Sequence, residues 1–483
     1  LDLLRYLDRD RETEVIMIYL EELRRGPEFV EAVKEITSGD RPTPVLVIKS
    51  GRTSAGAQAA ASHTGALAGS EAVYDSIFKQ AGIIRVESID ELFDYATVFS
   101  YKNESQLGKL RKKVPESNRV AIITNAGGPG IVATDMTISS GLELAHFHPD
   151  TVEALASHLP LTANLHNPVD VIGDASQQRY ENALSAVIKD EGVDCALVIL
   201  TPQSMTNALA TAEAITRVAR RTAKPIICSF MGIVDVSAGV KYLQEKGIPV
   251  FKFPENGARA LGALYRYSRW LNRQILAPFQ FTHDSTAAAE IIAENLAASR
   301  TYLSEIEGLR LLACYGFKVL DTQLADNADA AVALADDFGY PVVMKIVSDD
   351  IVHKSDAGGV IVGLEDADAV RDAFDRIMVN ARGYKADAEI RGVLVQQMAP
   401  AGEEVILGMN RYPIFGPLLM YGTGGVSVEV FQDVSFRLAP INRNGARNII
   451  RDTKGYRMLQ ALSLIHISEP TRLVHSSRMP SSA

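Results

Sequence analysis

The chain has 483 residues, of which 47% are hydrophobic and 22% are charged, and its formal net charge is −10 at pH 7. This length predicts about three domains of roughly 100 to 200 residues each. The acidic balance argues against a nucleic-acid partner, and no apolar run reaches the roughly 20 residues that a membrane helix requires. The three cysteines lie far apart, which predicts a reduced cytoplasmic protein without disulfides or a zinc site.

The first part of the chain alternates short apolar runs with helical segments. Strands are predicted at 15–20 and 45–48, and a helix at 70–80. Between the second strand and this helix lies the run of small residues SHTGALAG, which contains His63. A neutral imidazole nitrogen can attack a phosphoryl group, so His63 is a candidate covalent phosphate carrier. The alternative is a loop histidine that only satisfies backbone groups.

A second alternation follows a basic, polar connector at 102–118. Its predicted strands are 120–124, 195–200, 225–230 and 249–251, and its predicted helices are 130–140, 151–157, 179–189, 207–221 and 236–246. The first strand leads into the turn NAGGPG, where Gly127, Gly128 and Gly130 would let the backbone approach a phosphate at a helix N-terminus. The alternative is a tight turn without a ligand.

Residues 278–302 are interpreted as a polar, alanine-rich linker. Beyond it, helices are predicted at 305–315 and 327–338, and strands at 318–320, 341–346 and 392–398. Lys345 is expected at the end of its strand, where a lysine can pair with nucleotide phosphates. The segment DDIVHKSDAGGV places His353 on a loop that ends in Gly358 and Gly359, which suits a loop covering phosphates. An ordinary loop histidine is the alternative.

Four segments in this order resemble the acyl-CoA synthetase (NDP-forming) family, that is, the ADP-forming acetate–CoA ligases related to succinyl-CoA synthetase. They are SHTGALAG, ITNAGGPG, HKSDAGGV and GPLLMYGTGGVSVEVFQDVSFRLAP. The resemblance implies an α/β fold with two flavodoxin-like domains, each a doubly wound parallel sheet, followed by a partial ATP-grasp domain. The predicted domain bounds are 1–101, 117–277 and 303–461.

The resemblance also implies a role for individual residues. His63 would carry phosphate, and Glu21 would hold its second ring nitrogen, although Glu21 could instead begin a solvated helix. The glycines of NAGGPG would face the phosphohistidine, and His353 would be a second transient carrier. The residues implied for ATP binding are Lys345, Gly358, Gly359, Gln396, Gln397, Met398 and Glu404. Gln396, Gln397 and Met398 resemble the adenine hinge, and Glu404 a position near the ribose or phosphates.

The implied reaction interconverts acyl-CoA, phosphate and ADP with a carboxylate, CoA and ATP, through an acyl phosphate and a phosphohistidine. The partners would be these small molecules, and a homo-oligomer is allowed. Mg²⁺ would accompany the nucleotide, but its ligands are expected after residue 461, so no metal-binding residue is assigned. The alternative function is the ligase-like sensor region of a protein lysine acetyltransferase. The presence of both His63 and His353 favours the ligase.

Both ends of the chain are unusual. The first residues, from Leu1 onward, have the pattern of the interior of a domain. The CoA-binding domain of the family is therefore expected before Leu1. Residues 462–472 resemble translated adapter DNA from sequencing libraries, and we interpret 462–483 as a non-native tail. These observations predict a fragment that is inactive as a ligase by itself.

Overall fold

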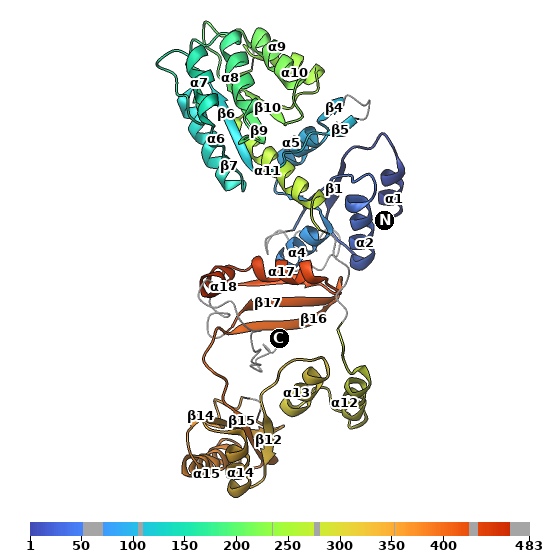
Figure 1. Ribbon diagram of the computed structural model, residues 1–483. Coiled ribbons are helices and arrows are strands. Elements are labelled where there is room, and N and C mark those ends of the chain that lie inside the picture. The colour runs from blue at the N-terminus through green and yellow to red at the C-terminus, as the bar shows by residue number, and fades with distance from the viewer. Residues whose placement is uncertain are drawn as a thin grey trace. The chain divides into compact units, whose positions relative to one another are not determined.

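The structure, a computed structural model, describes residues 1–51, 71–104, 110–233, 235–274, 281–351, 353–424 and 433–463. It divides into two compact units. Unit 1 comprises Leu1–Leu276, Asn410–Leu418 and Phe436–Pro440, and unit 2 comprises the remaining segments, Ala277–Met409, Leu419–Ser435 and Ile441–Ala483 (Figure 1). Within the described ranges, every helix is too short or too polar to cross a bilayer.

Unit 1 begins with a parallel sheet in the order β1–β2–β3. Its elements are α1 (Asp2–Arg9), β1 (Ile16–Leu20), α2 (Gly26–Ser38), β2 (Val45–Lys49), α4 (Glu71–Ala81), β3 (Ile84–Val86) and α5 (Ile89–Phe99). The central strand β2 is apolar on both faces. Val45 and Val47 pack in one hydrophobic cluster and Leu46 in another, all three fully buried. Burial on both faces is typical of parallel sheets covered by helices.

The second sheet of unit 1 is also parallel, in the order β11–β10–β9–β6–β7, and β8 pairs with β6. Its strands are β6 (Arg119–Thr124), β7 (Glu143–Leu144), β8 (Val169–Asp170), β9 (Cys195–Leu200), β10 (Ile226–Phe230) and β11 (Val250–Phe251). Its helices are α6 (Gly127–Ser139), α7 (Pro149–His158), α8 (Gln177–Lys189), α9 (Ala208–Ala219), α10 (Ser237–Glu245) and α11 (Pro254–Leu271). The predicted alternation of strands and helices is confirmed.

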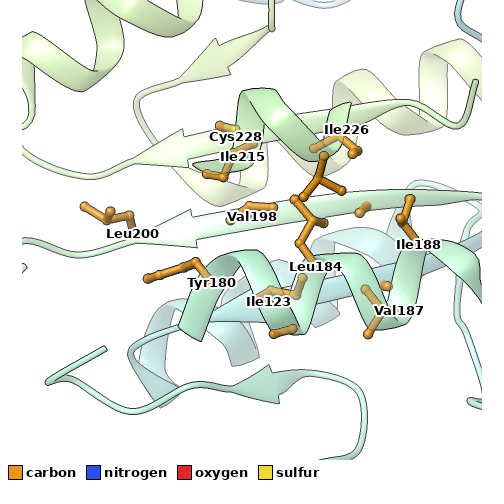
Figure 2. Packing of buried hydrophobic residues seen from close by; sticks show 14 of the residues in the cluster. Ile123, Tyr180, Leu184, Val187, Ile188, Val198, Leu200, Ile215, Ile226 and Cys228 are labelled. Atoms are coloured by element: carbon orange, nitrogen blue, oxygen red, sulfur yellow. The ribbon is translucent and has the colours of Figure 1, made fainter. Parts of the chain in front are cut away.

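Helices cover both faces of this second sheet. Figure 2 shows one face, where Val198 of β9 lies near Leu184 of α8 and Ile215 of α9. Tyr180 of α8 is fully buried, and its hydroxyl donates a hydrogen bond to the carbonyl of Ile199 (3.0 Å). The opposite face packs against α6 and α11 through a separate cluster that includes Ala133 and Leu261. The sheet is therefore doubly wound, as predicted.

The predicted connector at 102–118 is partly regular structure. It contains an antiparallel pair, β4 (Lys102–Glu104) and β5 (Leu110–Lys112). Lys113 is buried, and its ammonium donates to the carbonyl of Ala219 (2.8 Å). Burial lowers the pKa of Lys113 to about 8. The predicted basic, polar connector therefore contains a buried lysine that is hydrogen-bonded to α9.

A distant segment of the chain completes the core of unit 1. Phe415 is fully buried, and its ring lies 5.3 Å from that of Tyr74 in an edge-to-face arrangement. Gly26 donates its amide to the carbonyl of Ile414 (3.2 Å), and a Cβ on Gly26 would lie 2.4 Å from the Phe415 ring. The side-chain amide of Gln80 bonds both backbone groups of Leu438 (2.9 and 2.8 Å). Sequence reasoning assigned this segment to the ATP-grasp domain alone.

Replacement of Phe415 by alanine is expected to lower the free energy of unfolding of unit 1 by about 3–5 kcal/mol, because it empties a fully buried aromatic site. Urea unfolding followed by near-ultraviolet circular dichroism measures the change. Phe93→Ala, at a residue that is 60% exposed, is the matched control and should change stability by about 0.5 kcal/mol or less. Equal effects of the two variants would show that the 410–418 segment does not belong to this core.

Unit 2 contains an antiparallel sheet in the order β12–β15–β13–β14. The strands of this sheet, with the helices that precede and connect them, are α12 (Ser285–Ala297), α13 (Glu305–Cys314), β12 (Thr322–Ala325), α14 (Ala328–Phe338), β13 (Val342–Ser348), β14 (Val360–Leu364), α15 (Ala367–Tyr384) and β15 (Ile390–Gln397). Helices α14 and α15 cover one face, where Met344 and Ile346 are fully buried. Helix α12 lies inside the predicted linker 278–302.

The strand predicted at 318–320 is wrong, since the first strand of this sheet begins at Thr322. Its register is set by pairing, with Thr322 opposite Gln396 and Ala325 opposite Val393. The chain then continues into a three-stranded sheet in the order β16–β17–β18, followed by two helices. These elements are β16 (Val405–Tyr412), β17 (Gly416–Thr423), β18 (Val434–Leu438), α17 (Arg443–Arg451) and α18 (Tyr456–Ser463).

Candidate functional site

The candidate phosphate carrier His63 lies outside the described residues, but the strand ends beside its segment are described. Lys49 ends β2 and is paired in register with Leu20, the last residue of β1, so Glu21 and Lys49 lie at the same carboxyl edge. Glu21 is exposed. Lys49 is buried, with its ammonium 5.2 Å from the centre of the Tyr74 ring, and burial lowers the pKa of Lys49. The contact predicted between Glu21 and His63 stays a prediction.

The glycine-rich turn opens α6 as predicted. Ala126 is the N-cap residue, and no side chain caps the helix. Gly127 and Gly128 are exposed, and a Cβ at either position would meet nothing within 4 Å. Gly130 differs, because it is buried and its Cβ would lie 3.0 Å from the Thr124 side chain. Packing explains Gly130, whereas no packing contact explains the other two, whose amides lie at an uncapped helix N-terminus suited to an anion.

Asn125 fixes the strand end that carries this turn. Its side-chain amide donates to the carbonyl of Thr201 (2.8 Å), and its carbonyl oxygen accepts from the amide (2.8 Å) and the hydroxyl (2.9 Å) of Thr201. Thr201 follows β9, so these bonds join the carboxyl ends of two neighbouring strands. Asn125 therefore positions the start of α6 by holding its backbone on the sheet.

Replacement of Asn125 by alanine is expected to destabilise unit 1 by about 2 kcal/mol, because it leaves polar groups of Thr201 without their partner. The change is measured by urea unfolding. Asn182→Ala serves as the control, since Asn182 accepts only an exposed bond from Gln178 one turn earlier on α8. A destabilisation no larger than that of the control would contradict the positioning role.

Ile172 lies close to the same edge and has a backbone strain that sequence reasoning missed. Its φ is 69°, an unusual value for a β-branched residue. Its amide donates to Asp170 Oδ1 (2.9 Å), and the preceding amide of Val171 donates to the carbonyl of Thr124 (2.8 Å). Strained residues of this kind cost about 1–3 kcal/mol and cluster at functional sites. The strain supports a ligand-binding role for this edge of the sheet.

A polar cluster in unit 2 surrounds Lys345. Lys345 lies in the middle of β13 and not at its end, which corrects the prediction. Its Nζ is 2.7 Å from Oε1 of Glu305 and 2.8 Å from Oε1 of Gln396. Gln396 in turn donates to the hydroxyl of Thr322 (2.9 Å), and Lys354 Nζ lies 3.0 Å from Glu305 Oε2. Lys345 alternates along β13 with the core residues Met344 and Ile346, so this cluster lies on the opposite face of the sheet from α14 and α15.

Glu305 stays ionised in this cluster. Its side chain is 13% exposed, and burial by itself would raise the pKa of the carboxyl group. The ammonium groups of Lys345 and Lys354 outweigh that effect, and the pKa of Glu305 is lowered. The cluster thus holds two cations and one anion, so it carries a net positive charge at neutral pH. Such a face can attract a nucleotide phosphate.

The loop after β13 carries His353 and is shaped by its two glycines. Gly358 has a φ of 62°, and Gly359 lies so close to β13 that a Cβ would be 2.5 Å from the Ile346 side chain. The amide of Gly359 donates to the carbonyl of Lys354 (2.7 Å). His353 is exposed at the start of this turn. The backbone geometry accounts for both glycines, and their predicted role in ATP binding remains a prediction.

The predicted adenine hinge has two of its amides engaged within the protein. Gln397 donates its amide to the carbonyl of Asp321 (3.0 Å), and Met398 donates to that of Pro341 (3.2 Å). A contact from Gln397 or Met398 to an adenine base would therefore use groups other than these two backbone amides. Glu404 is exposed before β16, and its carbonyl accepts from the amide of Gly424 (2.7 Å). Within the described residues, no cluster of three or more His, Cys, Asp or Glu could hold a metal ion, so no residue is assigned to Mg²⁺.

Sequence reasoning missed Glu305 and Thr322. The pattern of Ser304 followed by Glu307 does predict the start of α13, and both bonds of this capping box are present. It places Glu305 in the first helical turn but gives no sign of a contact with a strand 40 residues later. Thr322 was missed because its strand was predicted too early.

Three family models match the chain. They are a succinyl-CoA ligase-like flavodoxin domain over residues 1–99, a ligase-CoA domain over 120–274 and an ATP-grasp domain over 294–471. A solved structure of the dinucleotide-forming acetyl-coenzyme A synthetase 1 of Ca. Korarchaeum cryptofilum, in complex with phosphate and ADP, matches with a TM-score of 0.50 and 33% identity, over 56% of each chain. The fold class predicted from the sequence is confirmed.

Curated relatives match over most of the chain. An ADP-forming acetate–CoA ligase I of Archaeoglobus fulgidus is 41% identical, and an ADP-forming 4-hydroxybutyrate–CoA ligase of Nitrosopumilus maritimus is 38% identical. Each alignment covers 95% of this chain but only 64% of the relative. The beta subunit of an ADP-forming acetate–CoA ligase I of Pyrococcus furiosus is 47% identical, over 36% of this chain and 76% of that subunit. The chain therefore belongs to the family of ADP-forming acetate–CoA ligases, the NDP-forming acyl-CoA synthetases.

Proposed function

We propose that the protein is an ADP-forming acyl-CoA synthetase that interconverts acyl-CoA, phosphate and ADP with a carboxylate, CoA and ATP. The chain spans less than two thirds of the length of the relatives that match most of it. The observation that carries the proposal is the cluster of Lys345 and Lys354 on the face of an ATP-grasp sheet opposite α14 and α15, with Lys354 directly next to His353 in the chain. A cationic site next to an exposed imidazole suits transfer of phosphate to a nucleotide.

The proposed sequence has one acyl transfer followed by three phosphoryl transfers. Phosphate attacks the acyl-CoA carbonyl and releases CoA as the thiol, which leaves an acyl phosphate. A ring nitrogen of His63 then takes the phosphoryl group and releases the carboxylate. The phosphoryl group passes to His353 and from there to the terminal phosphate oxygen of ADP, which forms ATP. The amides at the start of α6 would stabilise the phosphoryl charge at His63, and Lys345 and Lys354 would do so at the nucleotide.

Other features belong to the same proposal. Glu21 would hold the second nitrogen of His63, and Glu404 would lie near the nucleotide. Mg²⁺ would accompany the nucleotide phosphates, and none of the described residues is assigned as its ligand. Because CoA and adenine nucleotides are the substrates, we also propose a cytoplasmic location. A homo-oligomer is compatible with this function.

The test is a phosphate-dependent assay of the intact gene product. Acetyl-CoA and aryl-acetyl-CoA are each incubated with phosphate and ADP, ATP is measured by luciferase light emission, and free CoA is measured by thiol titration. The proposal predicts equal amounts of ATP and CoA, and no ATP when phosphate is left out. Transfer of acetyl groups to protein lysines without ATP formation would contradict it and favour the acetyltransferase sensor.

A further inference from the structure

One carboxylate lies between the two cations of the nucleotide face. Glu305 contacts Lys345 through Oε1 (2.7 Å) and Lys354 through Oε2 (3.0 Å), so each oxygen binds a different ammonium group. We propose that Glu305 is a built-in competitor of the nucleotide: its carboxylate and a nucleotide phosphate take turns on Lys345 and Lys354. This inference rests on the proposed function, because it assumes that these lysines bind nucleotide phosphate.

Helix α13 does not need the carboxylate of Glu305. The N-cap bonds of this helix come from Ser304 and Glu307, with Ser304 donating its hydroxyl (2.7 Å) and its amide (2.8 Å) to Glu307 Oε2. Arg300 pairs with the other oxygen of Glu307 at 2.7 Å. Among the described residues, the Glu305 carboxylate bonds to the two lysines, Lys345 and Lys354. Its role therefore lies in the lysine cluster and not in the helix cap.

The site has little room for two anions at once. The side chains of Glu305, Lys345 and Lys354 are 13%, 19% and 24% exposed. Lys345 also donates to Gln396, so two of its three ammonium hydrogens are already engaged. A phosphate that binds both lysines would lie against the carboxylate, where like charges repel strongly in a partly buried site. Phosphate binding is therefore expected to displace Glu305.

This exchange takes place beside the candidate phosphate carrier. Lys354 follows His353 directly, and its backbone carbonyl accepts the amide of Gly359 in the same turn. Through Lys354, Glu305 tethers this turn to the first turn of α13. Displacement of the carboxylate would free the Lys354 side chain to bind phosphate next to His353. The competitor also makes release of the nucleotide easier, because the carboxylate replaces the departing phosphate.

The test compares ADP binding by the whole chain and its Glu305→Gln variant, using isothermal titration calorimetry. Glutamine keeps the shape of the side chain but removes its charge. The dissociation constant for ADP is expected to fall about tenfold, while the affinity for adenosine, which has no phosphate, should stay the same. Glu307→Gln is the matched control, since it removes a carboxylate from the same helical turn without touching either lysine. Its ADP affinity should equal that of the unchanged chain.

Two further variants distinguish failure of this inference from failure of the proposed nucleotide site. Glu305→Asp keeps the charge at the helix start but is one methylene shorter, so its ADP affinity should lie between those of the unchanged chain and Glu305→Gln. If the glutamine variant fails to fold, the aspartate variant provides the test instead. Unchanged or weaker ADP binding by the Glu305 variants would overturn the inference. Lys345→Met tests the site itself: if this variant binds ADP as well as the unchanged chain does, the proposed nucleotide site is wrong, and the inference falls with it.

Discussion

Replacement of His63 by alanine in the intact protein is expected to reduce ATP formation from acyl-CoA, phosphate and ADP by at least about a thousandfold. The proposed route passes the phosphoryl group through this imidazole, and alanine offers no nucleophile in its place. Initial rates of ATP and CoA release measure the loss. Release of CoA in the first turnover can persist, because acyl phosphate forms before the histidine reacts.

His166→Ala is the control for this variant. His166 is an exposed loop residue whose backbone amide donates a hydrogen bond to Asn164 Oδ1. Its replacement should leave the rate of ATP formation unchanged. If the His63 variant retained the rate of the unchanged protein, phosphohistidine at this position would be excluded as an intermediate.

Replacement of His353 by alanine is expected to slow ATP formation by about a hundredfold or more while sparing phosphorylation of His63 by acyl-CoA and phosphate. The reason is the place of His353 beside Lys354 in the proposed nucleotide site of unit 2, whereas the acyl chemistry is assigned to His63. The measurement is mass spectrometry of His63 after incubation with acyl-CoA and phosphate, without ADP.

The order of the relay depends on this result. Phosphate that accumulates on His63 in the His353 variant, and is not passed to added ADP, supports transfer from His63 to His353. Loss of His63 phosphorylation in the same variant would show that His353 acts earlier. His283→Ala, at another exposed histidine of the same unit, is the matched control and should behave as the unchanged protein does.

The fold of unit 1 could be predicted because its signals are local. The apolar runs that become β6, β9 and β10 are each bounded by polar residues or proline, and their burial on both faces distinguishes them from amphipathic strands. The glycine-rich turn before α6 was predicted correctly for the same reason. An apolar strand, a glycine-rich turn and a helix in direct succession leave few alternatives.

Contacts between distant segments could not be predicted. Phe415 lies more than 300 residues from its partner Tyr74, and nothing in its own neighbourhood distinguishes it from a residue of the ATP-grasp domain. Gly26 is the sequence feature that corresponds to this contact, since only glycine allows the approach of Phe415. A single glycine at a helix start, however, has many explanations. Such pairs become visible only when both partners are placed in space.

The residues of the proposed nucleotide site were predicted in part. Lys345 and the HKSDAGGV segment were found because their composition is distinctive, yet the position of Lys345 within its strand was wrong, since strand ends are set by pairing with β15. Glu305 was missed altogether. A glutamate in the first turn of a helix is common, because it interacts favourably with the helix dipole, so its contact with two lysines leaves no trace in the local sequence.

The most direct measurement of the central claim follows phosphate on His63. The intact protein is incubated with ATP and Mg²⁺, and phosphopeptides are identified by mass spectrometry under neutral conditions that preserve phosphohistidine. The account predicts acid-labile phosphate on His63 that disappears when a carboxylate and CoA are added, with formation of acyl-CoA. An enzyme that forms acyl-CoA at full rate while His63 never carries phosphate would contradict it.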